Sequence, residues 1–498
     1  MVNVRLRSLR TPLLCLSGCL FIFLLVRLIG TPKNLPRLSL LYEKAIVHHG
    51  NLQEPATDEV ATSMDKDDLE TLLRGNENED WAQGNECPPY PRYENIHFPN
   101  PYYQLIQSGN LSYYLYGAYY DRRPRIAEVM VLGMVTTCTG PYPETYLQVW
   151  YDGDTKAEIV PMHQTKLGWY KEWGNYVDVA YPTLLTFQMK SKKIPRLVSL
   201  VFGNPCALPQ NALQVQVQPP PEYEEAPPNP NRRPRIGVCV KYLNFPDIDM
   251  SERFVEWLEL MRLLGASKVT AYDIGKLMPN TSRTLAHYTR PEDGLLDLRK
   301  FQFPEETKTY ERFRSVIIEV LLYNDCLYRS LYDFDFIAVL DVDEVIMPLG
   351  QLRNWQDLLG ELQSRDVNCT ARSSYCFRNV YYPKELPEDG SIPKPFYMLR
   401  HVVRVADHLN PALAIKCLHD IGHVTVLHNH FALQWMDSCA PFDVHSDLAQ
   451  MQHYRHVDDL KTLKEPPPVR DDNIRRLQQQ LIHNSMQVHR QLGWGAAY

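Results

Sequence analysis

A cluster of carboxylates at the end of an apolar run is the part of this sequence best suited to chemistry. Residues 336–340 are all apolar, and three acidic residues follow within four positions: Asp341, Asp343 and Glu344. Because residues two apart in an extended chain point to the same side, Asp341 and Asp343 can converge on one ion. Hard carboxylate oxygens suit Mn²⁺ or Mg²⁺, which keep coordination positions open for phosphate oxygens. The spacing therefore predicts a site for a metal and a diphosphate, with a solvated acidic turn as the alternative.

Strands and helices alternate in the sequence that leads to these carboxylates. Apolar runs predict strands at 236–243, 269–272 and 336–340. Helical spacing of apolar residues predicts one helix that begins near Asp249 and ends at Gly265, and another at about 310–329. Such alternation implies a mostly parallel α/β sheet, whose ligands bind beyond the carboxyl ends of the strands. Asp273 and Asp341 both lie at such ends.

Residues 86–216 differ from this part in being rich in tyrosine and proline. Short apolar or alternating runs at 126–135, 146–151, 176–179 and 197–202 are separated by Gly and Pro residues. This spacing predicts an antiparallel β-rich part, of which a sandwich is one form. Prolines then mark a stiff linker at 217–234, before the α/β part at 235–498.

The N-terminus predicts a membrane anchor. An uncharged run begins at Thr11 and, with Arg27 near its end, reaches about the ~20 residues that a helix needs to cross a bilayer. A cleaved signal peptide is the alternative, but no convincing small-residue cleavage site follows the run. We therefore expect a cytoplasmic tail at 1–10, a signal anchor at 11–30 and a polar stem at 31–85.

Three N-glycosylation sequons, at Asn110, Asn280 and Asn368, favour a lumenal location for everything beyond the anchor. Of the 11 cysteines, two lie in the anchor, so an odd number remains outside it and at least one must be free or intermolecular. A net charge of −7 without a long basic run argues against a nucleic-acid partner. A short anchor suits the thinner early secretory membranes, so we expect a single-pass type II protein of the Golgi membrane.

Several spaced motifs resemble glycosyltransferase family 92. They are the run from Glu256-Trp257 through Gly265 to Tyr272-Asp273, the runs 323–329 and 336–348, and His453-Tyr454-Arg455. The resemblance implies a GT-A-type fold, Mn²⁺ dependence, inversion at the sugar carbon and UDP-galactose as donor. Characterised relatives build β1,4-linked galactose on terminal galactose or on core fucose of N-glycans.

The resemblance also implies a histidine late in the domain as a further metal ligand. His430 is the first choice because it follows the predicted strand 424–427, and His428 and His453 come after it; each could equally be a structural histidine. Arg455 could pair with the diphosphate, since Arg favours bidentate phosphate contacts, or could form an ordinary salt bridge.

Two further aspartates are candidates for donor binding. Asp273, at a strand end, could bind the uridine ribose or base, and the alternative is that it caps a turn or helix. Asp325 matches the family motif but lies in a predicted helix, where a structural hydrogen bond is as good an interpretation.

An inverting transfer needs one carboxylate base that takes the proton of the acceptor hydroxyl. The acidic residues considered for this role are Asp407, Asp420 and Asp437. Asp420, which precedes the histidine-bearing strand, is our choice among them.

The expected activity is therefore a Mn²⁺-dependent transfer of galactose from UDP-galactose to terminal β-galactose of a glycoprotein N-glycan, with Mg²⁺ as an alternative ion. The alternatives within the same class are transfer onto core α1,6-fucose and use of another UDP-sugar. A different alternative is a non-catalytic, lectin-like Golgi protein, against which the presence of both Asp341 and Asp343 counts. The β-rich part could bind the acceptor or mediate a homodimer.

Overall fold

The computed structural model describes residues 66–75, 87–154, 156–176, 179–217, 232–304, 311–369 and 371–494. The expected cytoplasmic tail and membrane anchor, most of the stem and most of the linker lie outside these residues. Within the described ranges, no helix has both the length and the apolar character needed to span a bilayer. The described residues all belong to one compact unit.

The first part of the described chain is built almost entirely of strands. They are β1 (Gln104–Ser108), β2 (Leu111–Asp121), β3 (Glu128–Val135), β4 (Thr145–Trp150), β5 (Glu158–Pro161), β6 (Gln164–Leu167), β7 (Tyr181–Gln188), β8 (Leu197–Phe202) and β9 (Leu213–Gln216). They form one sheet in the order β5-β4-β8-β9-β2-β3-β7-β6, with β1 paired to β2. All neighbours pair antiparallel except β2 and β9, which pair parallel. Helix α2 (Lys66–Gly75) packs Leu69 and Leu73 against Tyr90 and Trp150.

Strand β2 explains how this sheet is held in place. Its residues Leu115 and Tyr120 face a core shared with β4, β7 and β8, whereas Tyr116 and Tyr119 face the opposite side. That opposite side packs on helix α6 (Glu311–Arg329), which contacts β2, β3 and β7. Both faces of β2 are therefore buried, which explains why its sequence lacks the simple alternation of a half-exposed strand.

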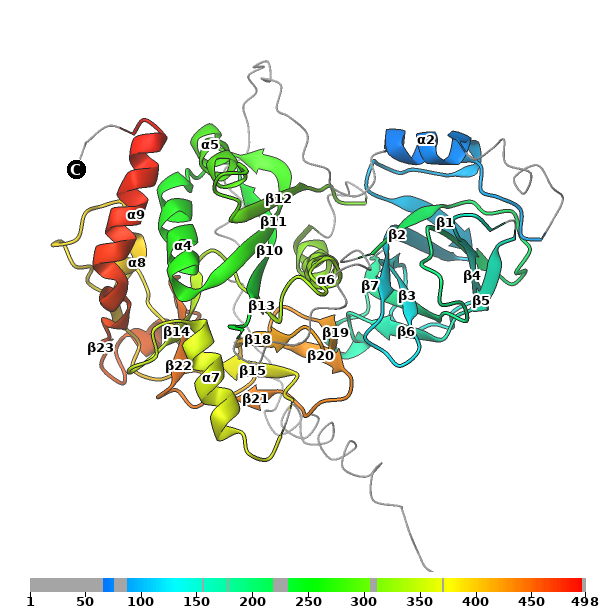
Figure 1. The fold of residues 1–498 in the computed structure, drawn as a ribbon. Helices are drawn as coiled ribbons and strands as arrows, with labels where there is room; N and C mark the ends of the chain where they lie inside the picture. The colour runs from blue at the N-terminus through cyan, green and yellow to red at the C-terminus, as the bar shows by residue number, and fades with distance from the viewer. Residues whose placement is uncertain are drawn as a thin grey trace, which may run out of the picture. The chain divides into compact units, whose positions relative to one another are not determined.

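The second part contains a seven-stranded sheet in the order β12-β11-β10-β13-β18-β15-β21 (Figure 1). These strands are β10 (Ile236–Phe245), β11 (Ala266–Leu277), β12 (Leu296–Lys300), β13 (Phe336–Val339), β15 (Ser374–Phe377), β18 (Lys416–Asp420) and β21 (Phe442–Asp443). Pairing is parallel from β12 to β13 and antiparallel on both sides of β18. The fold is thus α/β as predicted, but the sheet is mixed and changes direction next to β13.

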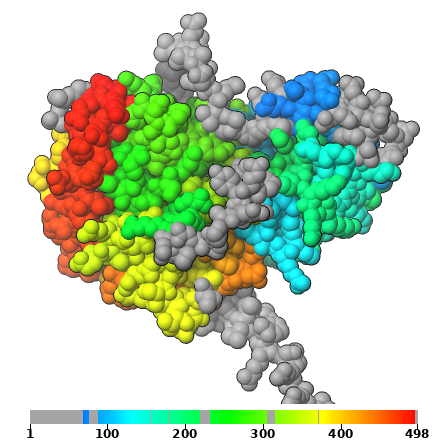
Figure 2. Space-filling model, in the orientation of Figure 1, coloured from blue at the N-terminus to red at the C-terminus, as the bar shows by residue number. Residues whose placement is uncertain are grey.

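Helices cover both faces of this sheet. Alternate residues of β13 divide between two cores: Ala338 packs with α4 (Ser251–Leu264), and Ile337 packs with α6. The remaining helices are α5 (Pro279–Tyr288), α7 (Trp355–Arg365), α8 (Tyr397–Arg400) and α9 (Gln478–Gln491), with short 3-10 turns η1 (Tyr93–Asn95), η2 (Lys171–Trp173), η5 (Leu460–Leu463) and η6 (Asn473–Leu477). Helix α9 lies over α4 at the surface (Figure 2).

Helix α4 ends where the sequence indicates. Gly265 has a φ of 97° in the left-handed region, which suits a glycine C-cap. The start is less simple than a capping box, because the helix begins at Ser251 and the Asp249 carboxylate accepts the backbone N–H of Ser251 at 3.0 Å.

Three smaller sheets complete the second part. The first joins β14 (Glu344–Pro348), β22 (Ala449–His453) and β16 (Asn379–Tyr381), the second β17 (Val403–Arg404) and β23 (Val469–Arg470), and the third β19 (Val424–Leu427) and β20 (Ala432–Trp435).

Eight of the nine cysteines beyond the expected anchor form disulfides. The pairs are Cys87–Cys206, Cys239–Cys326, Cys369–Cys439 and Cys376–Cys417. Cys138 is free and buried. The expectation that an odd cysteine remains is confirmed.

The three sequon asparagines are exposed, so we expect each to carry a glycan when the protein is made in secretory cells. Asn110 lies in the turn between β1 and β2, Asn280 in α5, and Asn368 in the loop after α7. Treatment with an N-glycosidase should lower the mass by three glycans, and Asn110→Gln should remove one of them. Asn280 also donates a hydrogen bond to Asp249 at 2.9 Å, so a protein that carries only two glycans would point to this position. An unchanged mass would contradict the lumenal location.

Candidate functional site

The predicted acidic site lies at the carboxyl end of β13, where the sheet changes from parallel to antiparallel pairing. The backbone N–H of Leu340 donates to Cys239 of β10, so the parallel pairing extends to the residue before Asp341. A tight turn follows, in which the Glu344 N–H donates to the Asp341 carbonyl at 3.0 Å and the Asp341 N–H donates to Glu344 Oε2 at 2.8 Å. Glu344 therefore fixes the turn, and the carboxylates of Asp341 and Asp343 project from it.

Two lysines that the sequence reading missed neutralise this turn. Lys416 of β18 is completely buried, with its Nζ 2.9 Å from Glu344 Oε2 and 3.5 Å from Asp341 Oδ2. Lys241 of β10 is partly exposed, with its Nζ 3.3 Å from Asp341 Oδ1 and 3.1 Å from Glu319 Oε1. Each lysine lies in an otherwise apolar run, a pattern that could have revealed it, since buried charges are almost always paired.

The two aspartates have opposite electrostatic environments. Burial alone would raise the pKa of Asp341, but the charges of Lys416 and Lys241 outweigh it and hold that pKa well below its usual range. Burial and the neighbouring Asp341 charge raise the pKa of Asp343 to about 6. Asp341 is therefore an anion at neutral pH, and a cation beside Asp343 would relieve the repulsion between the two carboxylates.

His453 is the histidine that comes close to these carboxylates. Its Nε2 lies 3.8 Å from Asp343 Oδ2 and 3.7 Å from Glu344 Oε1. Its ring stacks on Tyr381, with 5.4 Å between ring centroids, and its Nδ1 lies 3.3 Å from the Asn379 amide. The pairing of β14 with β22 places His453 opposite Glu344. Burial lowers the pKa of His453, which keeps a neutral imidazole available as a ligand.

The donor types at this turn fit a hard divalent cation. Asp341 Oδ1 is buried and faces the Lys241 ammonium at 3.3 Å, and Asp343 and His453 add a carboxylate and an imidazole nearby. Across the part of the chain that the structure describes, no three His, Cys, Asp or Glu side chains converge closely enough to form a complete ligand set. The chain thus supplies ligands of the right chemistry, while solvent and a phosphate ligand would have to fill the remaining positions.

His428 and His430 lie on the turn between β19 and β20, behind Lys416. Asn429, between them, accepts a hydrogen bond from Lys416 Nζ at 2.5 Å. The Nδ1 of His430 faces the Ile415 carbonyl at 3.2 Å. Burial and the charge of Lys416 lower the pKa of His430 to about 3. His453, rather than our first choice His430, therefore lies within 4 Å of both Asp343 and Glu344.

Asp325 occupies a different position from the one expected of a donor contact. It is completely buried, accepts hydrogen bonds from the hydroxyls of Tyr272 (2.6 Å) and Tyr119, and pairs with Arg329 at 2.8 Å. Burial raises its pKa, but Arg329 and Arg299 outweigh this and lower it. These contacts support the structural interpretation, in which Asp325 ties β2 and β11 to α6.

Asp273 and Arg455 make ordinary local contacts. Asp273 Oδ2 pairs with Lys300 at 2.9 Å, and its Oδ1 accepts a hydrogen bond from the Gly275 N–H at 2.8 Å. The second contact supports the alternative interpretation, in which Asp273 caps a turn. Arg455 is exposed, and its guanidinium lies 3.5 Å from Asp458. Burial and the charge of Asp341 raise the pKa of Asp343, and the charge of Arg455 lowers it by a smaller amount. Arg455 is therefore available near the acidic turn, and Asp273 is already bonded.

Asp420, our choice of base, lies beside the start of β13, whereas the acidic turn follows the end of that strand. It pairs with Phe336 at the start of β13, roughly 16 Å along the strand from Asp341. Asp437 lies in an exposed turn after β20, and Asp407 follows β17. A base must touch the attacking hydroxyl, and the position of Asp420 does not bring it to the acidic turn.

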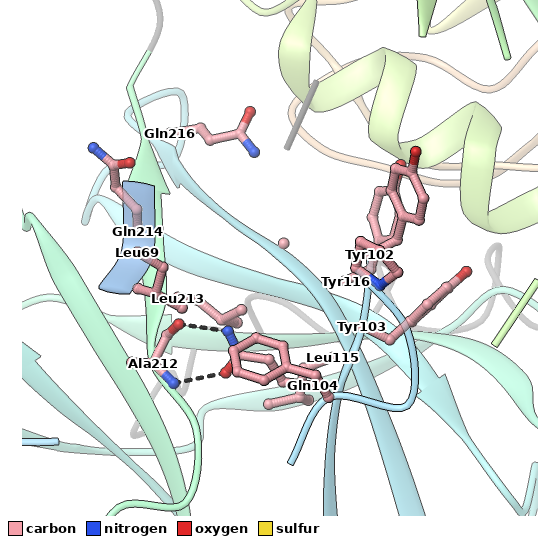
Figure 3. Close-up of a pocket in the computed structure, with 13 residues that line it drawn as sticks. Leu69, Tyr102, Tyr103, Gln104, Leu115, Tyr116, Ala212, Leu213, Gln214 and Gln216 are labelled. Atoms are coloured by element: carbon pink, nitrogen blue, oxygen red, sulfur yellow. Dashed lines mark hydrogen bonds between the residues drawn. The ribbon is translucent and has the colours of Figure 1, made fainter. Parts of the chain in front are cut away.

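A small cavity of about 50 Å³ lies on the β-rich part and not at the acidic turn (Figure 3). Its lining includes Tyr102, Tyr116 and Gln214, and Gln104 is held there by hydrogen bonds of 2.7 Å to both backbone groups of Ala212. None of the residues that line the cavity belongs to the acidic turn.

Comparison with known proteins identifies the second part of the chain. The sequence model of glycosyltransferase family 92 matches residues 235–490, just over half of the chain. No curated protein matches the sequence. Solved structures that resemble it include a mycobacterial protein (14% identity, TM-score 0.19, 30% of this chain and 42% of that one) and an active-site mutant of LgtC (13%, 0.17, 37% and 57%). The chain thus matches about half the length of these structures. On the family match, which contains the acidic turn and His453, the chain belongs to glycosyltransferase family 92.

Proposed function

We propose that this glycosyltransferase is an inverting, Mn²⁺-dependent galactosyltransferase that uses UDP-galactose and the acidic turn of Asp341 and Asp343. The observation that carries the proposal is the presence, in one turn, of an ionised Asp341 and of an Asp343 whose pKa is raised to about 6. A cation held by these carboxylates would relieve their repulsion and could also take diphosphate oxygens as ligands. The family match supports glycosyl transfer, and the resemblance of the motifs to galactosyltransferases supports the sugar.

Each residue around the turn has a role in this proposal. Asp341 and Asp343, with His453 beside them, would hold the ion, which would neutralise the charge of the departing nucleoside diphosphate. Lys416, being completely buried, orients Asp341 and Glu344 before any ligand arrives. Lys241 and Arg455 are accessible cations that can contact diphosphate oxygens beside the ion.

The acceptor and the setting complete the proposal. We favour the hydroxyl of a terminal β-galactose on an N-glycan, joined through a β1,4 linkage, over core α1,6-fucose. We place the enzyme in the Golgi membrane as a type II protein anchored by residues 11–30, with a stem at 31–85, the β-rich part at 86–216, the linker at 217–234 and a GT-A-type catalytic part at 235–498. The sequence features that favour this are the uncharged N-terminal run and the sequons.

The test is a donor and acceptor panel with the full-length protein in detergent. UDP-galactose, UDP-glucose and UDP-N-acetylglucosamine are each supplied with Mn²⁺ and with glycans ending in β-galactose or carrying core fucose, and products are read by mass. We expect a gain of one hexose from UDP-galactose on galactose-terminated glycans. Transfer from another UDP-sugar alone would contradict UDP-galactose as the donor. A product only on core-fucosylated glycans would contradict terminal galactose as the acceptor, and glycan binding with no transfer would favour a lectin-like protein.

A further inference from the structure

An aromatic cluster joins the β-rich part to the region of the acidic turn. Trp173, in the short turn η2 between β6 and β7, has its ring centroid 4.9 Å from that of His428 and 6.4 Å from that of Phe431. The rings of Tyr170 and Trp169 lie 5.0 Å and 5.5 Å from the same indole. In Figure 1, β6 and β7 approach β19 and β20, whose connecting turn carries His428 and Phe431.

The backbone that carries Trp173 is held in place. Trp169 is buried, and its indole N–H donates to the Gly174 carbonyl at 2.9 Å, closing the loop around η2. The N–H of Gly168 donates to Pro182 of β7 at 2.9 Å. Trp173 nevertheless keeps 37% of its surface exposed, which makes it one of the large apolar side chains that the described surface leaves open. A rigid, half-exposed indole is a preformed stacking surface.

His428 adds an unsatisfied polar group to this surface. Its Nδ1 is buried and makes no hydrogen bond. Its ring stacks on Phe431, with 5.2 Å between centroids, so the imidazole is fixed in orientation. Burial and the charge of Lys416 lower the pKa of His428 to about 4, so the imidazole is neutral and can donate or accept a hydrogen bond. A buried polar atom without a partner in a fixed ring is suited to a ligand that brings the partner with it.

The cluster is connected to the acidic turn through a short chain of contacts. His428 precedes Asn429, whose Oδ1 accepts a hydrogen bond from Lys416 Nζ at 2.5 Å. The same Nζ lies 3.5 Å from Asp341 Oδ2. The charge of Asp341 also reaches His430, where it raises the pKa slightly against the larger lowering by burial, Lys416 and His428. Buried contacts therefore link the turn that packs on Trp173 to the site proposed for the donor.

We propose that Trp173 and His428 form the subsite for a neutral pyranose of the acceptor glycan, with the indole stacked on the sugar and His428 Nδ1 bonded to one of its hydroxyls. A pyranose has an apolar face of C–H groups and a rim of hydroxyls, which matches an aromatic face beside one polar nitrogen. The inference rests on the proposed function for the identity of the acceptor. It assigns to the β-rich part a direct share in acceptor binding.

The kinetic test uses Trp173→Ala in the full-length protein. We expect the KM for a galactose-terminated glycan to rise about tenfold, while the KM for UDP-galactose and the rate of UDP-galactose hydrolysis without acceptor stay unchanged. Trp173→Phe should recover most of the loss, because it keeps a ring. The matched control is Trp435→Ala: Trp435 is also 37% exposed, but it pairs with Val424, at the end of the β19–β20 hairpin away from His428. Equal effects of Trp173→Ala and Trp435→Ala, or an equal rise in both KM values, would overturn the proposal.

A binding measurement separates this inference from the proposed function. N-acetyllactosamine is titrated into the full-length protein without donor or metal, and binding is followed by calorimetry. We expect saturable binding that Trp173→Ala weakens about tenfold and that His428→Phe, which keeps the ring but removes Nδ1, weakens to a smaller extent. If the wild type binds the sugar but transfers no galactose, the proposed function fails and the subsite stands. No saturable binding by the wild type, or unchanged affinity in either Trp173→Ala or His428→Phe, would overturn the subsite.

Discussion

Asp343→Asn is expected to lower the rate of galactose transfer by roughly two to three orders of magnitude, a loss typical of removing one electrostatic contact to a developing charge. The substitution keeps the shape of the side chain but removes the charge that would bind the cation. Burial and, after it, the charge of Asp341 raise the pKa of Asp343 to about 6, so a bound cation would favour its ionised form. Initial rates with UDP-galactose and a galactose-terminated glycan, at saturating Mn²⁺ and pH 7.5, provide the measurement.

The control for this variant is Asp447→Asn. Asp447 is highly exposed and pairs only locally with His445 at 3.1 Å, so its loss should leave the rate unchanged. Thermal unfolding of both variants should stay close to that of the wild type. An Asp343→Asn protein that folds normally and retains more than about a tenth of the activity would contradict the role of this carboxylate in holding the cation.

Asp325→Ala is expected to cost about 3–5 kcal/mol of the free energy of unfolding, the range for breaking a buried ion pair from one side. The substitution leaves Arg329 and the hydroxyl of Tyr272 without their common acceptor in a closed environment. Denaturant unfolding at pH 7 measures the loss. Tyr119→Phe, which removes one donor and keeps the carboxylate and arginine paired, should cost only about 1 kcal/mol.

The pH dependence of the Asp325 contribution has a definite sign. Its pKa in the folded protein is lowered, so its stabilising contribution is present above the unfolded pKa of about 3.9 and is lost as pH falls through the folded value. The difference in unfolding free energy between wild type and Asp325→Ala should therefore stay constant from pH 6 to 8 and shrink only in strong acid. A difference that disappears near pH 6 would contradict this account.

The strands and helices near the acidic turn could be predicted because their patterns agree with their burial. The runs at 236–243 and 336–340 correspond to β10 and β13, and the helix ending at Gly265 corresponds to α4. In the β-rich part, the predictions at 126–135, 146–151 and 197–202 correspond to β3, β4 and β8. The predicted strand at 176–179 is wrong in its position, because the strand begins at Tyr181 and Tyr176 belongs to the loop after η2.

The candidate site could be predicted only where its residues are close in sequence. Asp341 and Asp343 belong to one turn, so their proximity follows from their spacing of two residues. Lys416 and His453 reach that turn through the pairing of β18 with β13 and of β22 with β14. No local pattern in the sequence specifies such pairings. The choice of Asp420 as base is affected in the same way, because the antiparallel register of β18 on β13 places Asp420 opposite Phe336, away from Asp341.

The most direct measurement of the central claim is the affinity for UDP with and without Mn²⁺. UDP is titrated calorimetrically into the full-length wild type and into Asp341→Asn, Asp343→Asn and Asp447→Asn. The account predicts that the wild type and Asp447→Asn bind UDP at least about tenfold more tightly with Mn²⁺ than without it, and that the other two variants lose this difference. Equal UDP affinity of the wild type with and without Mn²⁺, or full metal dependence in both Asp341→Asn and Asp343→Asn, would contradict a metal and diphosphate site at this turn.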